Sequence, residues 1–497
     1  MKYKILILLT AAIGVSFTSI KKAELTTTTR QTSWVTTRVK SVSTKTKADV
    51  ILNLSATQQT VEGFGSCFNE LGWTSLSLLK PEDLKSVMKE LFSPGIGANF
   101  TVCRMPIGAN DFAINWYSLN ETDGDFDMSH FSIDNDQKTL IPFIKMAKEY
   151  NPAIKIWASP WSPPSWMKTN KHYAAKAYPR AGEFDEITKS DSVRVFTFDL
   201  LKLCISPKYD NGLPKDREGK EGTDMFIQED KYLKAYALYF SKFIDAYKSE
   251  GISIAAVMPQ NEFNSPQIFP SCCWTAKSLS NFIGQYLGPA MKEKGIQIYF
   301  GTMERPKAAL VDTIMDNRQS GQYISGVGFQ WAGKDALPVI HKKHPDLRLI
   351  QSEQECGNGD NDWRNTLHSW ELMKHYFNNG VSVYDYWNTS LLKGGISRWG
   401  WPQNSLVVVD AATKTFIYTP EYYLLKHVSH YVKQGAKKLK LSGTFADDVL
   451  AFVNPDKSVV VVVANQEPKD KTVSFSLNNE RFSPVLKANS FNTLIIK

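Results

Sequence analysis

The chain has 497 residues, of which 42% are hydrophobic and 22% charged, and this is ordinary for a soluble globular protein with an ample core. Its formal net charge is +8, but the basic residues are scattered rather than clustered, which argues against a nucleic-acid partner. The spacing of its six cysteines fits no metal motif, so we expect neither a zinc site nor a disulfide framework.

The N-terminus is predicted to be a secretory signal over residues 1–20. Lys2 and Lys4 precede an apolar run from Ile5 to Val15, and small residues follow. This run is too short to cross a bilayer comfortably, and no later stretch is long and apolar enough to do so. Removal of the two lysines lowers the formal charge to about +6. We therefore expect an exported monomer in the periplasm, on the cell surface or in the medium, without a membrane span.

The segment that follows the signal divides into two parts. Residues 21–48 are rich in Thr, Ser and Lys and show little apolar periodicity, which predicts a partly ordered tether. Residues 49–62 have the character of a strand. We expect this strand to join a small β-domain formed at the other end of the chain.

Residues 63–430 alternate short apolar runs with longer amphipathic segments. The runs are rich in β-branched and aromatic residues and are near-continuous, as in strands buried on both faces. Eight runs occur, at residues 61–68, 99–107, 154–161, 253–262, 296–304, 324–331, 347–355 and 381–389. Helical periodicity between them appears at residues 84–92, 140–150, 232–251, 278–295 and 363–380. Eight strand–helix units predict a (β/α)₈ barrel.

Two regions depart from this alternation. The interval from Trp161 to Ser253 is too long for one helix, and its polar, turn-rich residues 206–224 predict a large loop at the functional end of the barrel. After residue 430 the chain changes to short strands and tight turns, and "NPDKS" between two apolar runs predicts a hairpin. Residues 431–497 are therefore predicted to form a small β-sandwich.

The carboxyl ends of the predicted barrel strands carry the side chains expected of an active site. The fourth run ends in Asn261 and Glu262. Burial of a carboxylate at the end of a strand costs free energy unless the carboxylate has a function or a charged partner. The seventh run ends at Glu353, with Glu355 two residues beyond. Two acids facing each other across the barrel mouth suit cleavage of a glycosidic bond. The other strand ends supply Arg104, Asn110, Asp111, Trp161, Ser165, Trp166, Gln330, Trp331, Tyr386, Trp387 and Asn388.

Each of these residues also has a purely structural interpretation. The tryptophans could pack the barrel mouth, Arg104 could neutralise any buried acid, and Asp111 could cap a turn. The histidines of "HKKH", His341 and His344, are three apart, but no third ligand has a suitable spacing, so we interpret them as a solvated helix face. His172 could approach a substrate, although a structural role is favoured.

Several segments together resemble glycoside hydrolase family 30, over about residues 49–497. The similar segments are "GFGSCFNELGW" (63–73), "RMPIGANDF" (104–112), "ASPWSPPSWMKTN" (158–170), "PQNEF" (259–263), "QSEQECG" (351–357) and "DYWNTSLLKGGISRWGW" (385–401). The resemblance implies that Glu262 is the general acid/base and Glu353 the nucleophile. The residues alone leave Glu353 and Glu355 open, since both could face inward on an extended strand. The resemblance favours Glu353.

The same resemblance implies roles for neighbouring residues and a mechanism. Asn261 would bind the sugar hydroxyl beside the scissile bond, and Arg104 would keep Glu353 ionised. The sugar subsite would be lined by Asp111, Trp161, Trp331 and Trp387. The expected reaction is a double displacement with retention, without a metal or organic cofactor, and with an optimum on the acidic side of neutral.

Members of the family that this chain resembles act on several different substrates. "FQWAGK" (329–334) and "QECGNGD" (354–360) most resemble β-1,6-glucanases, so the first hypothesis is an endo-β-1,6-glucanase acting on a fungal-type polysaccharide. Glucosylceramidases carry His and Tyr where this chain has Gln330 and Ala332. Alternatives within the family are cleavage of glucosylceramide, another β-glucoside or xylan. A non-catalytic carbohydrate-binding protein is the alternative from another class, although binding alone does not need two opposed acids.

Overall fold

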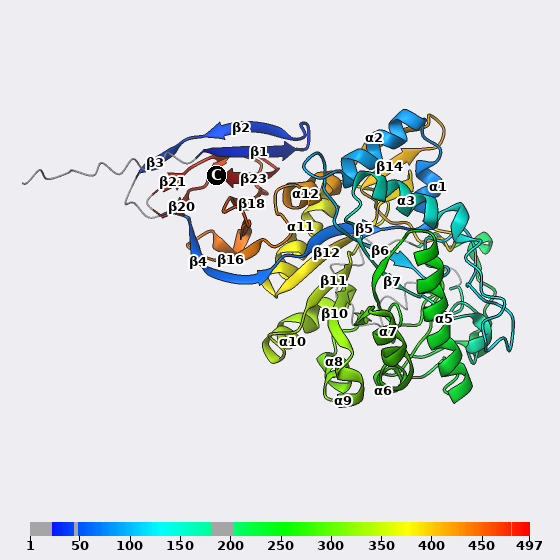
Figure 1. Ribbon diagram of the computed structural model, residues 1–497. Helices are drawn as coiled ribbons and strands as arrows, with labels where there is room; N and C mark the ends of the chain where they lie inside the picture. The colour runs from blue at the N-terminus through cyan, green and yellow to red at the C-terminus, as the bar shows by residue number, and fades with distance from the viewer. Residues whose placement is uncertain (1–21, 44–47, 180–202, 479) are drawn as a thin grey trace, which may run out of the picture.

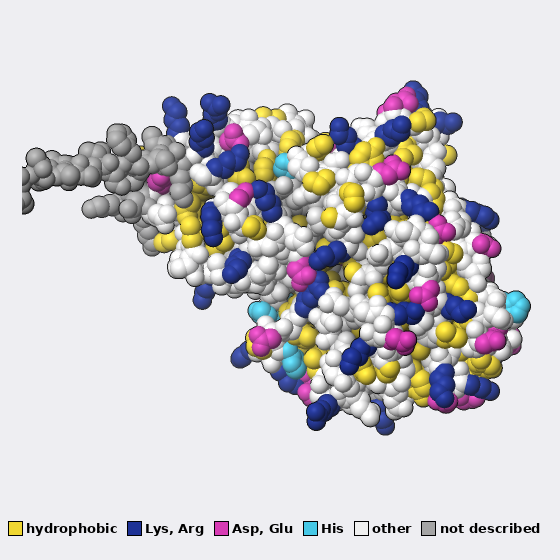
Figure 2. Space-filling view, in the orientation of Figure 1, with side chains coloured by type: hydrophobic (Ala, Val, Ile, Leu, Met, Phe, Trp, Pro, Cys, Tyr) yellow, Lys and Arg dark blue, Asp and Glu magenta, His cyan; other side chains and the backbone are white. Residues whose placement is uncertain are grey.

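The computed structural model describes residues 22–43, 48–179, 203–478 and 480–497, which form a barrel and a β-sandwich lying side by side (Figure 1). The signal predicted over residues 1–20 lies outside these ranges. Within them, no helix has both the length and the apolar character needed to cross a membrane. On the face shown in Figure 2, lysine and arginine side chains are spread among acids rather than gathered into one patch.

Eight parallel strands close the barrel, and all eight predicted runs are confirmed as its strands. In order around the barrel they are β5 (Gly63–Cys67), β6 (Val102–Pro106), β7 (Lys155–Ser159), β8 (Ile254–Val257), β9 (Gln297–Met303), β10 (Ile324–Gln330), β11 (Leu349–Glu353) and β12 (Val381–Asn388). Every residue of β5, β6, β11 and β12 is buried, because helices cover the outside and side chains fill the inside.

Helices surround the barrel (Figure 1). They are α1 (Glu70–Leu76), α2 (Pro81–Phe92), α3 (Leu140–Tyr150), α5 (Asp230–Ser249), α6 (Ala276–Phe282), α7 (Gly288–Lys294), α8 (Ala308–Met315), α9 (Arg318–Gly321), α10 (Leu337–Lys343), α11 (Trp363–Asn378) and α12 (Pro420–Ser429). The helix predicted over 278–295 contains a π-helical turn, Ile283–Leu287, between α6 and α7. This turn precedes Pro289, which lacks the N–H that a continuous α-helix would need.

Irregular segments extend the carboxyl end of the barrel. Between β7 and α5 the described residues form short 3₁₀ turns, Ser165–Met167, Pro207–Tyr209 and Lys215–Arg217, and isolated β-bridges such as that between Lys168 and Phe226, as expected of a large loop. A small sheet of β13 (Ser390–Leu392), β14 (Val407–Asp410) and β15 (Thr415–Tyr418) follows β12.

The β-sandwich is one ten-stranded sheet that closes over its own core. Its order is β2-β1-β23-β18-β17-β16-β4-β20-β21-β3. Leu25 near one end of this order and Phe475 near the other share one hydrophobic cluster, so the sheet must fold back on itself. The strands are β1 (Ala23–Thr29), β2 (Val35–Val39), β3 (Ser41–Ser43), β4 (Val50–Thr60), β16 (Lys437–Ser442), β17 (Val449–Val453), β18 (Val459–Asn465), β20 (Phe475–Leu477), β21 (Glu480–Phe482) and β23 (Ser490–Ile496), and a separate pair is β19 (Lys471–Thr472) with β22 (Val485–Leu486).

The sandwich is fixed to the barrel through α11. The Phe377 and Phe452 rings lie 5.5 Å apart, and the Trp363 and Phe491 rings 5.0 Å apart. Strand β4 pairs with β16 and β20, so the strand predicted over 49–62 joins the sandwich as expected.

The prediction of a tether over residues 21–48 is wrong for residues 23–43. Strand β1 pairs with β23 along its whole length, from Ala23 opposite Ile496 to Thr29 opposite Ser490. Thr26 and Thr28 are buried, and their hydroxyls bond to Tyr431 (2.6 Å) and His427 (3.0 Å). Threonine favours strands, and here it also finds polar partners beneath the sheet, which composition alone does not reveal.

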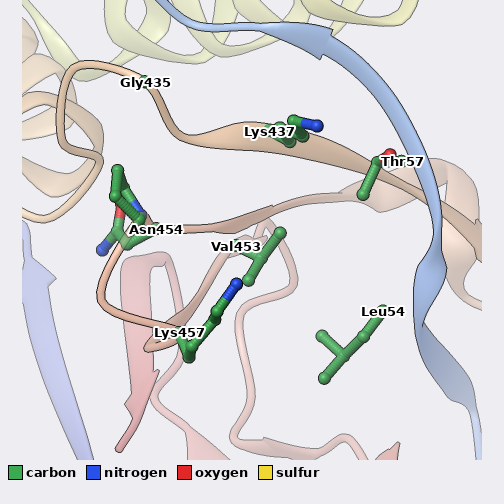
Figure 3. A pocket seen from close by; sticks show the side chains of 8 residues that line it. Leu54, Thr57, Gly435, Lys437, Val453, Asn454 and Lys457 are labelled. Carbon is green, nitrogen blue, oxygen red and sulfur yellow. The ribbon is translucent and has the colours of Figure 1, made fainter.

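A hollow of about 410 Å³ lies on the sandwich, beside strands β4, β16 and β17 (Figure 3). Its charged side chains are Lys437 and Lys457. Neither an acid nor an aromatic ring is among the described residues that line it, so these residues do not provide the groups that glycosidic cleavage requires. The lining is formed by Leu54, Thr57, Gly435, Lys437, Val453, Asn454, Pro455 and Lys457.

Candidate active site

The two predicted acids meet at the carboxyl end of the barrel. Glu353 is the last residue of β11, whereas Glu262 lies on a turn five residues beyond the end of β8. Both are buried, with only 5% of Glu262 and 4% of Glu353 exposed. The amide nitrogen Nε2 of Gln330 lies 3.2 Å from Glu262 Oε1 and 3.2 Å from Glu353 Oε2. These two oxygens are therefore no more than twice 3.2 Å apart.

Glu353 is surrounded by hydrogen-bond donors. Arg104 Nη1 donates to its Oε2 at 2.8 Å, and the indole Nε1 of Trp331 donates to its Oε1 at 3.0 Å. Burial raises the pKa of Glu353, but the charge of Arg104 and the bonds from Trp331 and Gln330 oppose that rise. Its oxygens thus meet the partners of an ionised carboxylate.

Arg104 is held rigidly by polar and aromatic neighbours. Besides Glu353, its guanidinium donates to Ser159 Oγ at 2.9 Å and to Asn261 Oδ1 at 2.7 Å. The rings of Trp161 and Trp387 lie 4.2 and 5.4 Å from its central carbon. A planar fork fixed in this way aims one nitrogen at Glu353 and another at Asn261.

Glu262 has the environment of a proton carrier. Its Oε2 accepts from Gln267 Nε2 at 2.8 Å, and its backbone N–H donates to Thr302 Oγ1 at 2.9 Å. Its φ of +45° is uncommon outside glycine, and such backbone strain is typical of functional sites. Burial, together with the charges of Glu304 and Glu353, raises the pKa of Glu262 well above its ordinary value. Of the two acids, Glu262 therefore holds the proton.

In the side-chain amide of Asn261, the oxygen is hydrogen-bonded to the protein and the nitrogen is free to donate. Its Oδ1 accepts from Arg104 Nη2 at 2.7 Å and from Thr302 Oγ1 at 3.1 Å. Among the described residues, no side chain or carbonyl accepts from its Nδ2. This amide is thus oriented to donate into the space beside the two acids.

Asp111, Trp161 and Trp387 lie together beside Arg104. The two indole rings stack with their centres 5.2 Å apart, and both lie near the Arg104 guanidinium. Burial, followed by the charge of Glu353, raises the pKa of Asp111 well above its ordinary value. Asp111 Oδ1 and Trp387 Nε1 are buried without a partner among the described residues. Buried polar atoms are normally satisfied, so these two are candidates for bonds to a ligand.

Glu355 is a structural acid. Lys334 Nζ lies 2.7 Å from its Oε1 and His368 Nε2 lies 2.9 Å from its Oε2. These partners overcome burial and lower the pKa of Glu355 to about 2. The contacts of Glu355 lead away from Glu262, whereas one Gln330 nitrogen contacts both Glu353 and Glu262. Glu353 is therefore the better placed of the two acids to react together with Glu262.

The other strand-end residues stabilise loops rather than face the acids. Ser165 Oγ donates to Glu121 at 2.6 Å, and Trp166 Nε1 donates to the Asn120 carbonyl at 3.0 Å. Asn388 Nδ2 donates to Gln403 Oε1 at 3.0 Å. Asn110 Oδ1 accepts from the Phe112 N–H at 3.0 Å, and the buried Tyr386 hydroxyl has no hydrogen-bond partner among the described residues.

The histidines considered in the sequence lie elsewhere. His172 Nε2 contacts the Asn211 carbonyl at 3.0 Å, and His344 contacts Asp312 at 3.3 Å. In the described ranges, no group of three or more His, Cys, Asp or Glu side chains could hold a metal ion, so His341 and His344 form no such site.

Sequence reasoning missed three contributors, Gln267, Thr302 and Glu304. Gln267 and Glu304 lie in loops that follow β8 and β9, and nothing in their spacing indicates that they reach Glu262. Thr302 is near the end of β9, where a strand-end rule could have found it. Gln330 was noted in the sequence as a strand-end residue and as a departure from glucosylceramidases, but not as the residue between the two acids.

Comparisons with known proteins cover both the barrel and the β-sandwich. The sequence model of the Glycosyl hydrolase family 30 TIM-barrel domain matches residues 61–198 and 195–432, and that of the Glycosyl hydrolase family 30 beta sandwich domain matches residues 435–494. Putative glucosylceramidase 1 of Caenorhabditis elegans is 27% identical over 84% of this chain and 75% of its own length. Endo-1,6-beta-D-glucanase neg1 of Aspergillus fumigatus is 24% identical over 89% of this chain and 86% of its own length.

Solved structures share the fold. SrfJ from Salmonella typhimurium has a TM-score of 0.80 at 21% identity, covering 95% of this chain and 99% of its own. The endo-beta1,6-glucanase BT3312 has a TM-score of 0.76 at 24% identity, with the same coverage of 95% and 99%.

Proposed function

This chain belongs to glycoside hydrolase family 30 and is therefore a glycosidase, and we propose that it is a retaining enzyme that cleaves β-1,6-linked glucan internally. The observation that carries the mechanism is the pair of 3.2 Å contacts from one Gln330 nitrogen to both acids. A separation of at most twice 3.2 Å is below the about 6.5–9.5 Å that inverting enzymes use to admit a water between their carboxyl groups.

In the first half-reaction, Glu353 attacks the anomeric carbon and forms a covalent glycosyl ester. Glu262 gives its proton to the departing glycosidic oxygen, so the aglycone leaves as an alcohol. The high pKa of Glu262 supports this role, because the residue keeps its proton until the leaving oxygen needs it.

In the second half-reaction, Glu262 reverses its role. Esterification removes the negative charge of Glu353, which is one of the causes that raise the pKa of Glu262. Glu262 then takes a proton from water, whose oxygen attacks the anomeric carbon and releases Glu353. Two displacements at one carbon return the β configuration.

The surroundings of the acids fit a sugar in the subsite. The open amide of Asn261 would donate to the hydroxyl next to the anomeric carbon. Asp111 Oδ1 and Trp387 Nε1, which lack protein partners among the described residues, would accept from and donate to hydroxyls of the nonreducing sugar. The Trp161–Trp387 stack would form an apolar wall against the ring, with Trp331 on the side of Glu353.

Support for a β-1,6-glucan comes from the segments around Gln330 and Glu355 and from the glucanases among the relatives. A second candidate is a glucosylceramide-type β-glucoside, because putative glucosylceramidases align at 27–28% identity against 22–24% for the glucanases. We favour the glucan, since Gln330 and Ala332 stand where glucosylceramidases carry His and Tyr.

The test is product analysis on β-1,6-glucan, β-1,3-glucan, xylan, glucosylceramide and an aryl β-glucoside, with the Glu353→Ala variant as the control. Short β-1,6 oligomers that appear early and depend on Glu353 support the proposal. Single glucose units from chain ends would refute internal cleavage, and preferential release of ceramide would assign the second candidate. Proton NMR of the first product formed should show the β anomer, and an α product would contradict retention.

A further inference from the structure

We propose that the side-chain amide of Gln330 is a spacer that sets the distance between the two carboxyl groups by donating to both at once. The inference rests on the proposed roles of Glu262 and Glu353. It assigns Gln330 a positioning role that acts through those two residues rather than through the substrate.

Gln330 lies between the acids because of an irregularity in the barrel. Along the β10–β11 pair, Phe329 is opposite Gln351 but Gln330 is opposite Glu353, so the register skips Ser352. Bulges of this kind re-aim side chains near active sites. Here the shift places the last residue of β10 directly beside the last residue of β11.

The orientation of the Gln330 amide is fixed. Its Oε1 accepts a hydrogen bond from Ser352 Oγ at 2.9 Å, and the residue is fully buried. Its Nε2 must therefore face the carboxyl oxygens, at 3.2 Å from each. The third nearby acceptor, Asn261 Oδ1 at 3.3 Å, already receives bonds from Arg104 and Thr302. Both N–H groups of Gln330 are thus available to the two acids.

The shape of the amide fits the distance that retention requires. The two N–H bonds of an amide nitrogen diverge by about 120°. With both nitrogen–oxygen distances at 3.2 Å, the two acceptor oxygens are then about 5.5 Å apart, which matches the about 5–5.5 Å between the carboxyl groups of retaining glycosidases. A single-point donor such as an indole could contact one acid but could not space the pair. Gln330 therefore does what Trp331, bound only to Glu353, cannot.

Gln267 provides a natural contrast. Its Nε2 donates to Glu262 Oε2 at 2.8 Å and to Ser265 Oγ at 2.9 Å, and no contact of it reaches Glu353. Gln267 thus assists one acid, whereas Gln330 joins two. Each donor favours the ionised form of the carboxyl group that it contacts, so its loss raises the pKa of that group.

Other charges around the pair must be kept constant in any test. Glu262 feels the charges of Glu304 and Asp111, and Glu353 feels that of Arg104. Glu304 is itself bonded to Arg305 at 2.6 Å. Near the end of β11, the charged side chains of Lys334 and His368 both contact Glu355. The substitutions below leave all of these charges in place.

The experiment compares Gln330→Met with Gln267→Met in the full chain. The kcat/KM of Gln330→Met on an aryl β-glucoside should fall about 10- to 100-fold, because the reacting groups lose their spacing. Both limbs of its pH profile should move to higher pH, the acidic limb with Glu353 and the alkaline limb with Glu262. Gln267→Met should move the alkaline limb alone.

Carboxyl ¹³C NMR titration of glutamate-labelled protein, assigned with Glu262→Gln and Glu353→Gln, gives the same information without turnover. If the wild type cleaves no β-glycoside, the proposed function fails, while the titrations still decide the role of Gln330. Unshifted titrations in Gln330→Met, a shift in only one acid, or near-wild-type kcat/KM would overturn the spacer. Should Gln330→Met not fold, Gln330→Leu is also neutral and lacks both donors, and it must shift both acids upward in the same way.

Discussion

Two acids that are only two residues apart, Glu353 and Glu355, lie in regions of opposite character. Around Glu355, Lys334 and His368 satisfy both oxygens. Arg104 and Trp331 likewise donate to the two oxygens of Glu353, but polar atoms close to Glu353 are left unpaired. Asp111 Oδ1 and Trp387 Nε1 nearby have no partner among the described residues, and the second acid, Glu262, is held protonated.

The difference shows that burial alone does not mark a catalytic acid. Both glutamates are equally buried, at 4% exposed. The difference lies in their surroundings. Around Glu355 the protein itself satisfies the polar groups, whereas around Glu353 it leaves a donor, an acceptor and a proton that a ligand can use.

The largest expected effect comes from removing each acid in turn. Glu353→Gln should lower kcat/KM at least about 10⁴-fold, because no other group can form the glycosyl ester. Glu355→Gln should change it by less than about 10-fold, since Glu355 does not reach the reacting atoms. Steady-state kinetics of both variants on one aryl β-glucoside provide the comparison. Equal losses in the two variants would mean that the regions are not functionally distinct.

Arg104→Lys tests whether the reactive region depends on a rigid fork. A lysine can approach Glu353 but cannot also bind Ser159 and Asn261, so we expect a loss of about 100-fold in kcat/KM. The acidic limb of the pH profile should move to higher pH, because Glu353 loses stabilisation of its charge. A loss of rate with an unchanged acidic limb would show that Arg104 acts only on packing.

Stability should respond in opposite directions in the two regions. The pKa of Glu355 is lowered from 4.5 to about 2, so its stabilisation is present above pH 4.5 and is lost as the pH falls through about 2. Glu355→Gln should cost about 3 kcal/mol of unfolding free energy at pH 7. Glu262 has a raised pKa and therefore destabilises the fold as the pH rises above its unfolded value, so Glu262→Gln should stabilise it at pH 8. Guanidinium denaturation of the wild type and both variants at pH 3, 7 and 8 measures these changes in unfolding free energy. A Glu355→Gln variant that is more stable than the wild type at pH 7 would contradict the structural role of Glu355.

The smallest effects are expected at the open polar atoms. Asp111→Asn and Trp387→Phe should each raise KM about 10-fold through the loss of one bond to the sugar, with a smaller change in kcat. Trp370→Phe is the matched control, because Trp370 is equally buried but packs on Phe491 of the sandwich. A KM change in Trp370→Phe as large as that in Trp387→Phe would indicate general loosening rather than lost substrate contacts.

The barrel strands could be predicted from sequence because strands buried on both faces have near-continuous apolar runs. Glu353 was found in the same way, as an acid that ends such a run. Glu262 was found by the same rule, although the apolar run that it ends continues five residues past β8, onto a turn.

Other features depended on contacts that no local pattern records. The bond from Gln267 to Glu262 arises from the path of an irregular loop, and the spacing by Gln330 arises from a one-residue register shift. Residues 23–43 were mistaken for a tether because a threonine-rich composition hides which hydroxyls have buried partners.

The most direct test of the central claim is to trap the covalent intermediate. A 2-deoxy-2-fluoro-β-glucoside with an activated leaving group should inactivate the protein, and peptide mass spectrometry should place one fluoroglucosyl group on Glu353, in wild type and in Glu355→Gln alike. A label on Glu355 or on any other residue would contradict the assignment of Glu353 as the nucleophile.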